Sequence, residues 1–304
     1  MASSSVMETL SNELASAAER SGASVVAVHA RRRMPSSGIE WRKGIVVTAD
    51  HAIYREEEIN VIRAGGKTVS ASLVGRDPST DLALLKTAES GSEVADFGEG
   101  AGLKLGQLVL ALGRSWRGNL VASAGIIGGL SGEWRSARGG MLDQHIRLDL
   151  ALYPGFSGGP LVNTQGKIIG VNTRGLTRGR AVTVPVVTVN RVVDELLEKG
   201  HIARPYLGLA MQTVTIPDSM RAKLESGANS GLLVMHVDSG SPADKAGLLL
   251  GDVLAEVQGK ALEDMDTIQD LLASAKVGDS IAIRALRGGA MVQLSVKLGD
   301  RPRR

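Results

Sequence analysis

Residues 153–173 read YPGFSGGPLVNTQGKIIGVNT, and the role of Ser157 in this stretch decides the class of fold. Ser157 lies among glycines between two apolar runs, PLVN and KIIGVNT, that are typical of strands. A serine in this setting is either a nucleophile or a small residue of a tight turn, because glycine, serine and proline gather where a chain reverses. It can react only if a base accepts its proton, so the rest of the chain has to supply that base.

The segment GFSGG also matches G-x-S-x-G, the nucleophile elbow of α/β-hydrolases. The elbow needs a helix after the serine, with an acid and a histidine later in the chain. Here a strand–turn–strand pattern follows Ser157, and the later histidines are His201, in a linker, and His236, inside an apolar strand. We therefore reject an α/β-hydrolase esterase.

The composition is that of an ordinary globular protein of about two domains. The net charge is only +3 and the basic residues are mixed with acidic ones, so no nucleic-acid partner is expected. We expect Arg31, Arg32 and Arg33 to form a solvated loop and not a phosphate-binding site. Near the pocket expected beside Ser157, a Gly-rich hairpin carries Arg174, Arg178 and Arg180, which we expect at a solvated loop tip, with regulatory contacts as the alternative. The absence of cysteine excludes disulfides and thiolate chemistry.

The sequence predicts no membrane span and shows no secretory signal. On these patterns the chain is expected in the cytoplasm, unless a signal has been removed.

Two regions of the chain follow different hydrophobic patterns. Between Ser24 and Pro185, short apolar runs alternate with turn residues, which predicts a β-sandwich or barrel, with residues 31–43 as a short connection between the first two strands. After Pro205, strands mix with two helices in a small α+β module. Alternation in HIRLDLAL, residues 145–152, predicts a strand with one buried face.

Helical spacing marks three further segments. One is an N-terminal helix with Leu10, Leu14, Ala17 and Ala18 on one face, and another has its apolar face at Val189, Val192, Val193, Leu196 and Leu197 and is ended by Gly200. A third carries Ile268, Leu271 and Leu272. The expected domains are a helical segment at 1–22, a β-rich domain at 23–200 and the α+β module at 203–300.

Three histidines precede Ser157, and one of them stands where a base is needed. His51 ends the strand GIVVTAD, whereas His29 and His145 alternate with apolar neighbours and are expected to be structural. Asp81 begins a later strand, 30 residues after His51 and 76 before Ser157. The order His, Asp, Ser is that of a serine triad on a β-barrel scaffold.

TADHA, DPSTDLALLK and PGFSGGPLVN, in this order and spacing, resemble the three catalytic segments of trypsin-like serine proteases of the HtrA/Deg family. The module after Pro205 resembles the PDZ domain of that family, so the likeness covers about 24–298. It implies a mainly β fold, with a two-barrel (chymotrypsin-fold) protease domain followed by an α+β PDZ domain. It also implies an ATP-independent serine endopeptidase of unfolded or damaged proteins that needs no metal or organic cofactor.

The resemblance further implies a homotrimer joined through the N-terminal segment, and a family often found in the cell envelope. Its PDZ domain is expected to bind C-terminal peptides.

The resemblance assigns a role to each matched residue. Ser157 is the expected nucleophile, His51 its base and Asp81 the group that orients the base, while the N–H groups of Gly155 and Ser157 form the oxyanion hole. Ala151, six residues before Ser157, and an apolar wall imply cleavage after small or medium aliphatic residues; the wall comprises Ala181, Val182 and Thr183. The expected peptide groove comprises Tyr206, Leu207, Gly208, Leu209, Ile268, Leu271 and Leu272.

Two residues depart from the family pattern. Phe156 precedes the serine and Asp50 precedes the histidine, where the family usually has Asn. A bulky Phe156 beside the oxyanion site leaves open whether the hole is preformed. It also leaves an alternative function, a catalytically silent scaffold or chaperone that binds peptides through its PDZ domain.

Overall fold

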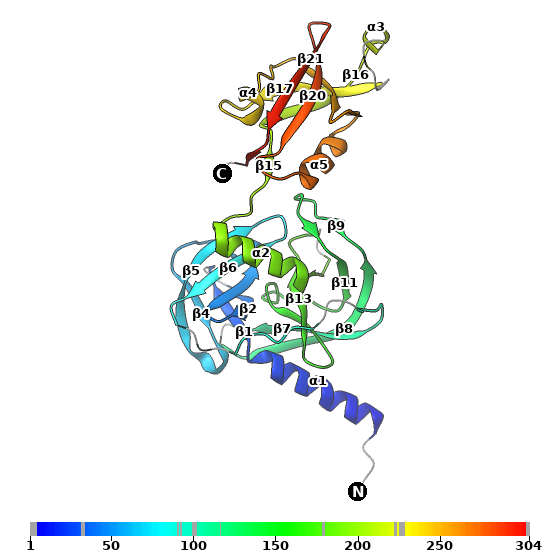
Figure 1. Cartoon of the computed structure of the whole chain (residues 1–304). Helices are drawn as coiled ribbons and strands as arrows, with labels where there is room; N and C mark the ends of the chain where they lie inside the picture. Colours follow the sequence, from blue (N-terminus) through cyan, green and yellow to red (C-terminus); the bar gives the residue numbers. More distant parts are fainter. Residues whose placement is uncertain are drawn as a thin grey trace. The chain divides into compact units, whose positions relative to one another are not determined.

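Two six-stranded antiparallel barrels form from the strands that follow Ser24 (Figure 1). The computed structural model describes residues 5–31, 34–89, 91, 93–98, 102–115, 117–177, 180–221, 224 and 229–301. The chain divides into two compact units, Met1–Ile202 and Ala203–Arg304, and both barrels belong to the first. Mainly β structure was predicted, and it is confirmed.

The first barrel has the strand order β1–β2–β3–β6–β5–β4. The register between β3 and β6 pairs Ala49 with Leu82, so the end of β3 lies beside the start of β6. His51 comes two residues after β3 and Asp81 directly precedes β6, so this pairing brings the two residues together. The strands are β1 (Val25–His29), β2 (Ser36–Arg42), β3 (Ile45–Ala49), β4 (Ile59–Ile62), β5 (Thr68–Asp77) and β6 (Leu82–Thr87).

The second barrel has the order β11–β14–β13–β12–β7–β8. Beyond the ladder between β12 and β13, the N–H of Gly158 donates to the carbonyl of Asn172 at 2.9 Å. The segment around Ser157 is thereby attached to the end of β13. The strands are β7 (Leu108–Arg114), β8 (Leu120–Ser131), β11 (His145–Asp149), β12 (Pro160–Asn163), β13 (Ile168–Thr173) and β14 (Val182–Pro185), with the small hairpin β9 (Trp134–Arg135) and β10 (Met141–Leu142) beside them.

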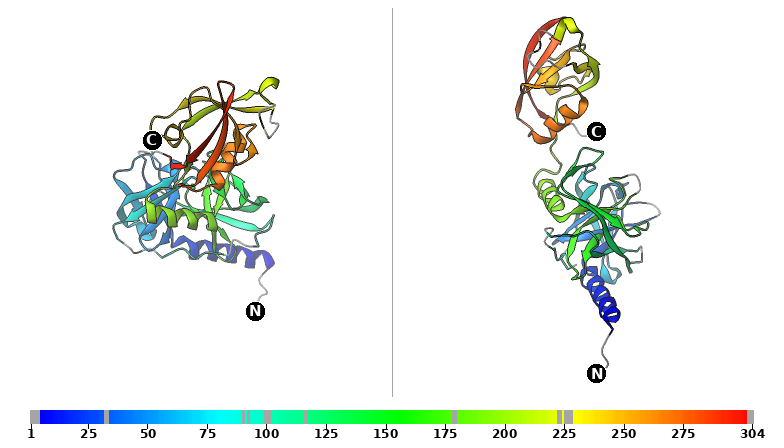
Figure 2. Two further views of the ribbon diagram at one scale, coloured as in Figure 1. Left: turned by 45° about the horizontal axis from the view of Figure 1, so that its top comes forward. Right: turned by 90° about the vertical axis from the view of Figure 1, so that its right-hand side faces the viewer.

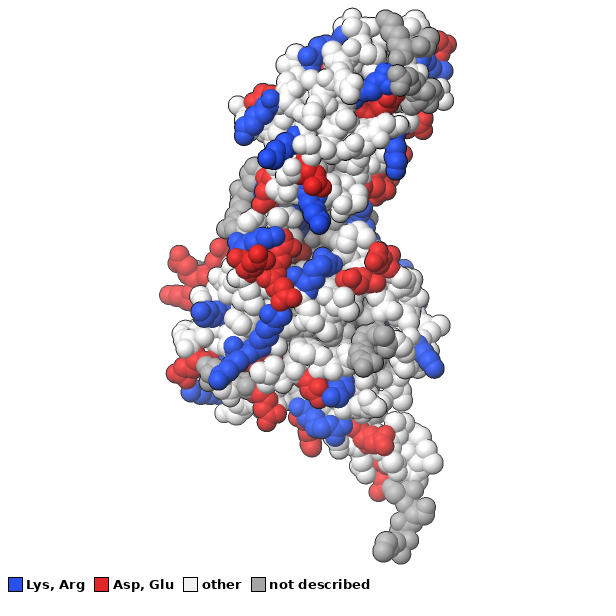
Figure 3. Space-filling model, viewed as in Figure 1, with Lys and Arg blue, Asp and Glu red and all other residues white. Residues whose placement is uncertain are grey.

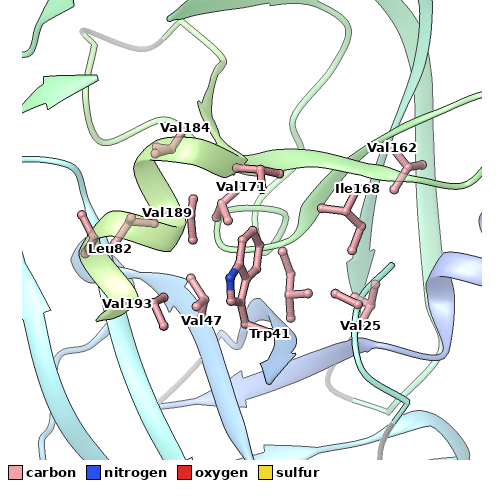
Figure 4. Close-up of a cluster of buried hydrophobic side chains, with 14 of the residues drawn as sticks. Val25, Trp41, Val47, Leu82, Val162, Ile168, Val171, Val184, Val189 and Val193 are labelled. Atoms are coloured by element: carbon pink, nitrogen blue, oxygen red, sulfur yellow. The ribbon is translucent and has the colours of Figure 1, made fainter. Parts of the chain in front are cut away.

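A shared hydrophobic core joins the two barrels around Trp41 (Figure 4). Trp41 is 1% exposed, and its ring centroid lies 4.3 Å from that of Phe97. Its Nε1–H donates a hydrogen bond to the side chain of Asn190. Val47 of the first barrel and Val171 of the second face the same ring (Figure 4). Because close-packed interiors resist displacement, this core fixes the barrels, and the residues at their facing ends, relative to each other.

Two helices cover this unit (Figure 2). α1 (Val6–Gly22) begins at the Ser5 cap and packs beside β7 and β12, with Leu14, Ala17 and Ala18 against the shared core. α2 (Val186–Lys199) packs against strands of both barrels and ends at Gly200, whose φ of 72° is left-handed. Both predicted helices are confirmed. Two short 3₁₀ turns, η1 (Asp50–Ala52) and η2 (Ala64–Gly66), complete the first barrel.

In this unit one strand was not predicted, and the strand predicted from residue 145, with one buried face, is confirmed but shorter than expected. Residues 36–42, expected as a connection, form β2. The sequence did not reveal this strand because both of its faces are buried, so polar and apolar residues do not alternate along it. Gly38 is required there, since a Cβ atom would lie 2.9 Å from Val28 and Val46. β11 ends at Asp149 and covers only part of the predicted strand at 145–152.

The second unit contains a six-stranded sheet, and its described residues form three short helices. Its strands are β16 (Leu209–Thr215), β17 (Ser230–Val237), β18 (Val253–Val257), β19 (Lys260–Ala261), β20 (Ser280–Arg287) and β21 (Ala290–Lys297), and β15 (Pro205–Tyr206) pairs separately with β22 (Gly299–Asp300). The helices are α3 (Asp218–Arg221), α4 (Pro242–Lys245) and α5 (Met265–Ser274). Ser241 caps α4 as a serine before proline predicts, and β16 forms one edge of the sheet.

Within the described part of the chain, no helix is both long and apolar enough to cross a bilayer.

Candidate active site

His51 and Asp81 form a hydrogen-bonded pair at the end of the first barrel. Nδ1 of His51 lies 2.7 Å from Oδ2 of Asp81, and the backbone N–H of His51 donates to Oδ1 at 2.9 Å. A carboxylate can only accept, so Nδ1 carries a proton, and in the neutral imidazole Nε2 then has the free lone pair. The imidazole is 30% exposed while Asp81 is fully buried, so the pair presents a base to solvent with its carboxylate behind it.

Thr173, the last residue of β13, supports this pair from the second barrel. Its hydroxyl donates to Oδ2 of Asp81 and accepts from the N–H of Gly175 at 2.8 Å. Gly175 has no room for a side chain, since a Cβ atom would lie 2.7 Å from Nδ1 of His51 and against the carboxylate of Asp81. The carboxylate is therefore fixed by both barrels.

Asp50, the residue before His51, pairs with a different side chain. Its carboxylate binds Arg76, which also pairs with Glu56 at 3.1 Å. Burial raises the pKa of Asp50, against the opposing effect of the bond to Arg76. Asp50, at the position where the family pattern has Asn, thus belongs to an ion-pair cluster with Arg76 and Glu56, and the nearby charge of Asp81 also raises its pKa.

The loop before Ser157 has the features of a type II turn. The N–H of Phe156 donates to the carbonyl of Tyr153 at 3.1 Å, and Gly155, at the third position, has a φ of 95°. A positive φ at that position defines type II and favours glycine, and Pro154 at the second position fits the same turn. Neither the N–H of Gly155 nor that of Ser157 donates to any residue that the structure describes, so both remain available to an oxyanion.

Ser37 of β2 forms hydrogen bonds with the backbone of this turn and of Ser157. Its hydroxyl donates to the carbonyl of Gly155 at 2.7 Å and accepts from the N–H of Arg114 at 3.0 Å. Its own N–H donates to the carbonyl of Ser157 at 3.1 Å. Ser37 is completely buried, so these bonds are shielded from water. The peptide units Gly155–Phe156 and Ser157–Gly158 are thereby tied to the first barrel.

Phe156 does not obstruct the site. Its side chain is 4% exposed and packs in the core of the second barrel with Leu148, Leu152 and Leu161. The ring centroid lies 5.9 Å from that of Tyr153. The aromatic ring therefore anchors the turn in the barrel.

A cleft of about 430 Å³ opens over these groups. His51, Ser157 and Gly155 all line it, and Asp81 lies buried behind His51. The hydroxyl of Ser157 has no hydrogen-bond partner among the described residues, as is common before a substrate shortens the contacts of a free enzyme. The other lining residues are Arg31, Met34, Pro35, Ser36, Tyr153, Pro154, Arg174 and Gly175.

The four residues expected in a specificity pocket do not line this cleft. Val182 and Thr183 are buried in β14, where the hydroxyl of Thr183 donates to Asn172. Ala181 packs against the core that contains Phe156, and Ala151 is exposed just before the turn. The sequence pattern identified an apolar neighbourhood in the second barrel, but the structure distributes its members between core and surface.

The residues expected to bind peptides in the second unit lie at one edge of its sheet. Tyr206 ends β15, Gly208 has a φ of 85°, and Leu209 begins β16, the edge strand. Leu207 is buried, and its carbonyl accepts from Ala243. α5 lies next to β16; there Ile268 is 1% exposed and belongs to the core, whereas Leu271 and Leu272 are half-buried.

Ser37, Thr173 and Arg31 are site residues that the sequence did not reveal. Their positions depend on contacts between the barrels, and no local pattern distinguishes them. Of the two arginine clusters expected in solvent, Arg31 and Arg174 lie in the cleft and Arg180 is exposed, while Arg32, Arg33 and Arg178 lie outside the described residues. In the described ranges, no three His, Cys, Asp or Glu side chains gather to hold a metal ion.

Comparison with known proteins agrees with this geometry. Residues 36–171 match the family model of the trypsin-like peptidase domain, and residues 205–298 match that of the PDZ domain. The "Serine protease Do-like HtrA" of Lactobacillus helveticus is 37% identical over 270 residues, which cover 84% of this chain and 65% of the relative. The chain belongs to the HtrA family of serine proteases.

Other HtrA proteins are similar over the same region. The "Serine protease Do-like HtrA" of Bacillus subtilis (strain 168) is 32% identical over 274 residues, 85% of this chain and 61% of that protein. The chain thus spans somewhat less than two thirds of the length of these curated relatives. The solved HtrA-type protease AlgW, in complex with a decapeptide, has 26% identity and a TM-score of 0.72, with 96% of this chain and 99% of that one covered.

Proposed function

We propose that this HtrA protein is an ATP-independent serine endopeptidase whose triad is His51, Asp81 and Ser157. The observation that carries this proposal is the cleft, which is lined both by Ser157 and by a histidine that a buried carboxylate orients. The HtrA relatives do not favour the alternative of a catalytically silent scaffold.

The reaction follows from these positions. Oγ of Ser157 attacks the carbonyl carbon of the scissile peptide while Nε2 of His51 takes the hydroxyl proton. The N–H groups of Gly155 and Ser157 donate to the resulting oxyanion, and each such donor is worth about 3–4 kcal/mol of barrier. The imidazolium, stabilised by Asp81, gives its proton to the leaving nitrogen as the C–N bond breaks. Water then hydrolyses the acyl-enzyme by the same route in reverse, and Ser157 recovers its proton.

Labelling with a fluorophosphonate tests the nucleophile directly. The unmodified protein should be labelled and should cleave casein, while Ser157→Ala should not be labelled. Ser157→Ala and His51→Ala should each lower turnover at least about 10⁴-fold, the loss typical of triad members. Retained activity in either variant would show that the nucleophile or the base is assigned wrongly.

We further propose that cleavage follows small or medium aliphatic residues and that the natural substrates are unfolded or damaged proteins. The apolar side chains of Met34, Pro35 and Pro154, which line the cleft, support the first point. Mass spectrometry of peptides released from reduced, unfolded casein would map the residue before each cut. A majority of cuts after Lys or Arg would contradict this preference.

The second unit is proposed to bind C-terminal peptides at the edge of β16. A peptide strand can add to this edge, and the turn at Gly208 can offer backbone N–H groups to a terminal carboxylate. Leu209, Leu271 and Leu272 would contact its side chains. Fluorescence anisotropy should show binding of a labelled peptide with a free C-terminus and much weaker binding of its C-terminal amide.

We also propose a homotrimer joined through the N-terminal segment at 1–22, ahead of a protease domain at 23–200 and a PDZ domain at 203–300. The apolar residues Val6 and Met7, 84% and 72% exposed, support α1 as a contact surface.

A further inference from the structure

Two arginines, one from each barrel, line the cleft beside His51 and Ser157. Arg31 lies two residues after β1, and Arg174 directly follows β13. The reacting groups therefore have a guanidinium on each barrel beside them. Neither arginine is used by the proposed chemistry.

Arg31 is held in place by hydrogen bonds to backbone carbonyls, which do not neutralise its positive charge. Its Nε donates to the carbonyl of Ala52 at 3.1 Å and its Nη2 to the carbonyl of His51 at 2.5 Å. The guanidinium also stacks on Tyr54, 4.5 Å from the ring centroid. These contacts orient the fork, and no described residue accepts a hydrogen bond from its Nη1.

Arg174 belongs to the second barrel and also lines the cleft. Arg174 directly follows Thr173, whose hydroxyl donates to the carboxylate of Asp81. The hydrogen bond that holds Asp81 therefore also fixes the backbone next to Arg174. Its side chain is exposed and makes one long bond, from Nη1 to the carbonyl of Leu152 at 3.4 Å. Most of its hydrogen-bonding capacity is therefore free for a ligand.

The charge of both arginines is not neutralised locally. Of the described residues that line the cleft, none is acidic. Asp81 is buried and bound to His51, and the carboxylates of Asp50 and Glu56 are paired with Arg76. Elsewhere basic and acidic side chains are interspersed, as on the face in Figure 3. Within the described chain, neither Arg31 nor Arg174 has an ion-pair partner.

We infer that Arg31 and Arg174 make this cleft selective for peptide segments that carry acidic side chains on both sides of the cleaved bond. The inference rests on the proposed peptidase function of the same cleft and deepens it. An extended peptide placed across Ser157 passes both barrels, so it can meet one guanidinium before the scissile bond and the other after it. Guanidinium forks bind carboxylates in a planar, two-bonded geometry, which discriminates Glu from Gln.

The test compares blocked peptides, acetylated at the N-terminus and amidated at the C-terminus, so that no terminal carboxylate is present. All have the same aliphatic residue at the cut, with Glu or Gln at the flanking positions. For the full chain, kcat/KM for the Glu peptide should exceed that for the Gln peptide by about three- to fivefold per acidic residue, as for exposed ion pairs. The ratio should approach one near 1 M salt, where the screening length falls to about 3 Å.

Charge-reversal variants identify the source of the selectivity. In Arg174→Glu and in Arg31→Glu, the Glu:Gln ratio should fall, and in the double variant it should drop below one. Arg174→Lys should keep part of the preference. Arg147→Glu is the matched control, because Arg147 is an exposed arginine of β11 that does not line the cleft, and it should keep the ratio of the unmodified protein.

Binding to the Ser157→Ala variant gives a second readout that does not need catalysis. Tighter binding of the Glu peptide, lost in the double charge reversal, supports the inference. Equal binding of the two peptides, binding of neither, or a preference that survives the double reversal overturns it. If no peptide is cut and no fluorophosphonate reacts, the proposed peptidase function fails, while the binding comparison still decides the role of the arginines.

Discussion

Gly175 occupies a position where the His51–Asp81 pair leaves no space. Its φ is not in the left-handed region, so alanine would not strain the backbone there, but its Cβ would push against both side chains of the pair. We expect Gly175→Ala to lower kcat by about 10²-fold or more, the usual effect of a misplacement near 1 Å in a catalytic group. Steady-state cleavage of a blocked peptide measures this.

Gly132→Ala is the control for this change. Gly132 lies in the same unit, and a Cβ there would meet no atom within 4 Å. Equal kcat values for the two alanine variants would show that the pair tolerates displacement, and that the close approach of Gly175 has no catalytic importance.

Ser37 gives a second prediction at this scale, because its hydroxyl holds the carbonyl of Gly155. Ser37→Ala frees the peptide unit between Gly155 and Phe156, inside the turn that presents the N–H of Gly155. We expect kcat to fall by about 10-fold or more with little change in KM, since a donor to the oxyanion acts in the transition state. Affinity for a peptide aldehyde should fall by the same factor as kcat/KM.

Loss of stability alone has to be separated from this effect. Ser21→Ala also removes a buried hydroxyl, one that donates to the carbonyl of Gly166 at 2.6 Å away from the cleft. It should lower the melting temperature comparably but leave aldehyde affinity unchanged. If both serine variants lose aldehyde affinity equally, Ser37 has only a structural role.

Among the elements, the turn before β18 and the strand β20 depend on one buried carboxylate. Asp252 accepts two bonds from Arg287, at 2.8 and 2.7 Å, and one from the N–H of Leu249. Burial opposes the charge of Asp252, but the bonds from Arg287 and Leu249 outweigh it and lower the pKa of the carboxyl. A lowered folded pKa stabilises the fold above the unfolded value of about 3.9, and this stability is lost as pH falls through the folded pKa.

Asp252→Asn should therefore destabilise the second unit at pH 7, by roughly 1–3 kcal/mol, the cost of broken buried hydrogen bonds. The difference from the unmodified protein should shrink below about pH 4. The three tryptophans, at 41, 116 and 134, all precede residue 203, so tryptophan fluorescence does not report on the second unit. Hydrogen exchange of the backbone amides of β17 is therefore the suitable measurement. A difference that stays constant from pH 7 to pH 3 would rule out the ionised carboxylate as its source.

The elements also show how far sequence patterns reach. His51 and Asp81 could be predicted, because each flanks a strongly apolar strand and their order is that of a known triad. β2 was missed because SSGIEWR has no period-two pattern when both of its faces are buried.

The shared position of the two cleft arginines was not predicted, for a different reason. Local composition predicts a solvated loop for Arg31 and Arg174, and only the packing of the two barrels around Trp41 brings these loops to one cleft. Contacts between loops that lie far apart in the sequence leave no pattern in either local segment. The support of Asp81 by Thr173, 92 residues away, is of the same kind.

At the scale of the whole molecule, the proposed trimer can be tested through α1. Leu14, Ala17 and Ala18 of this helix pack on the core, so they are used within the chain. Val6 and Met7, near its start, remain exposed, and burying such side chains is worth about 1.5–3 kcal/mol each. Light scattering should give about three times the chain mass of 31.8 kDa for the unmodified protein.

The double variant Val6→Glu/Met7→Glu should shift this mass toward that of one chain, because buried, unpaired carboxylates oppose association. Leu250→Glu is the control, since Leu250 is equally exposed, at 72%, but belongs to the second unit. The control should keep the trimer mass. A trimer that survives the double substitution would exclude the start of α1 from the interface, and a single-chain mass for the unmodified protein at every concentration would exclude the trimer itself.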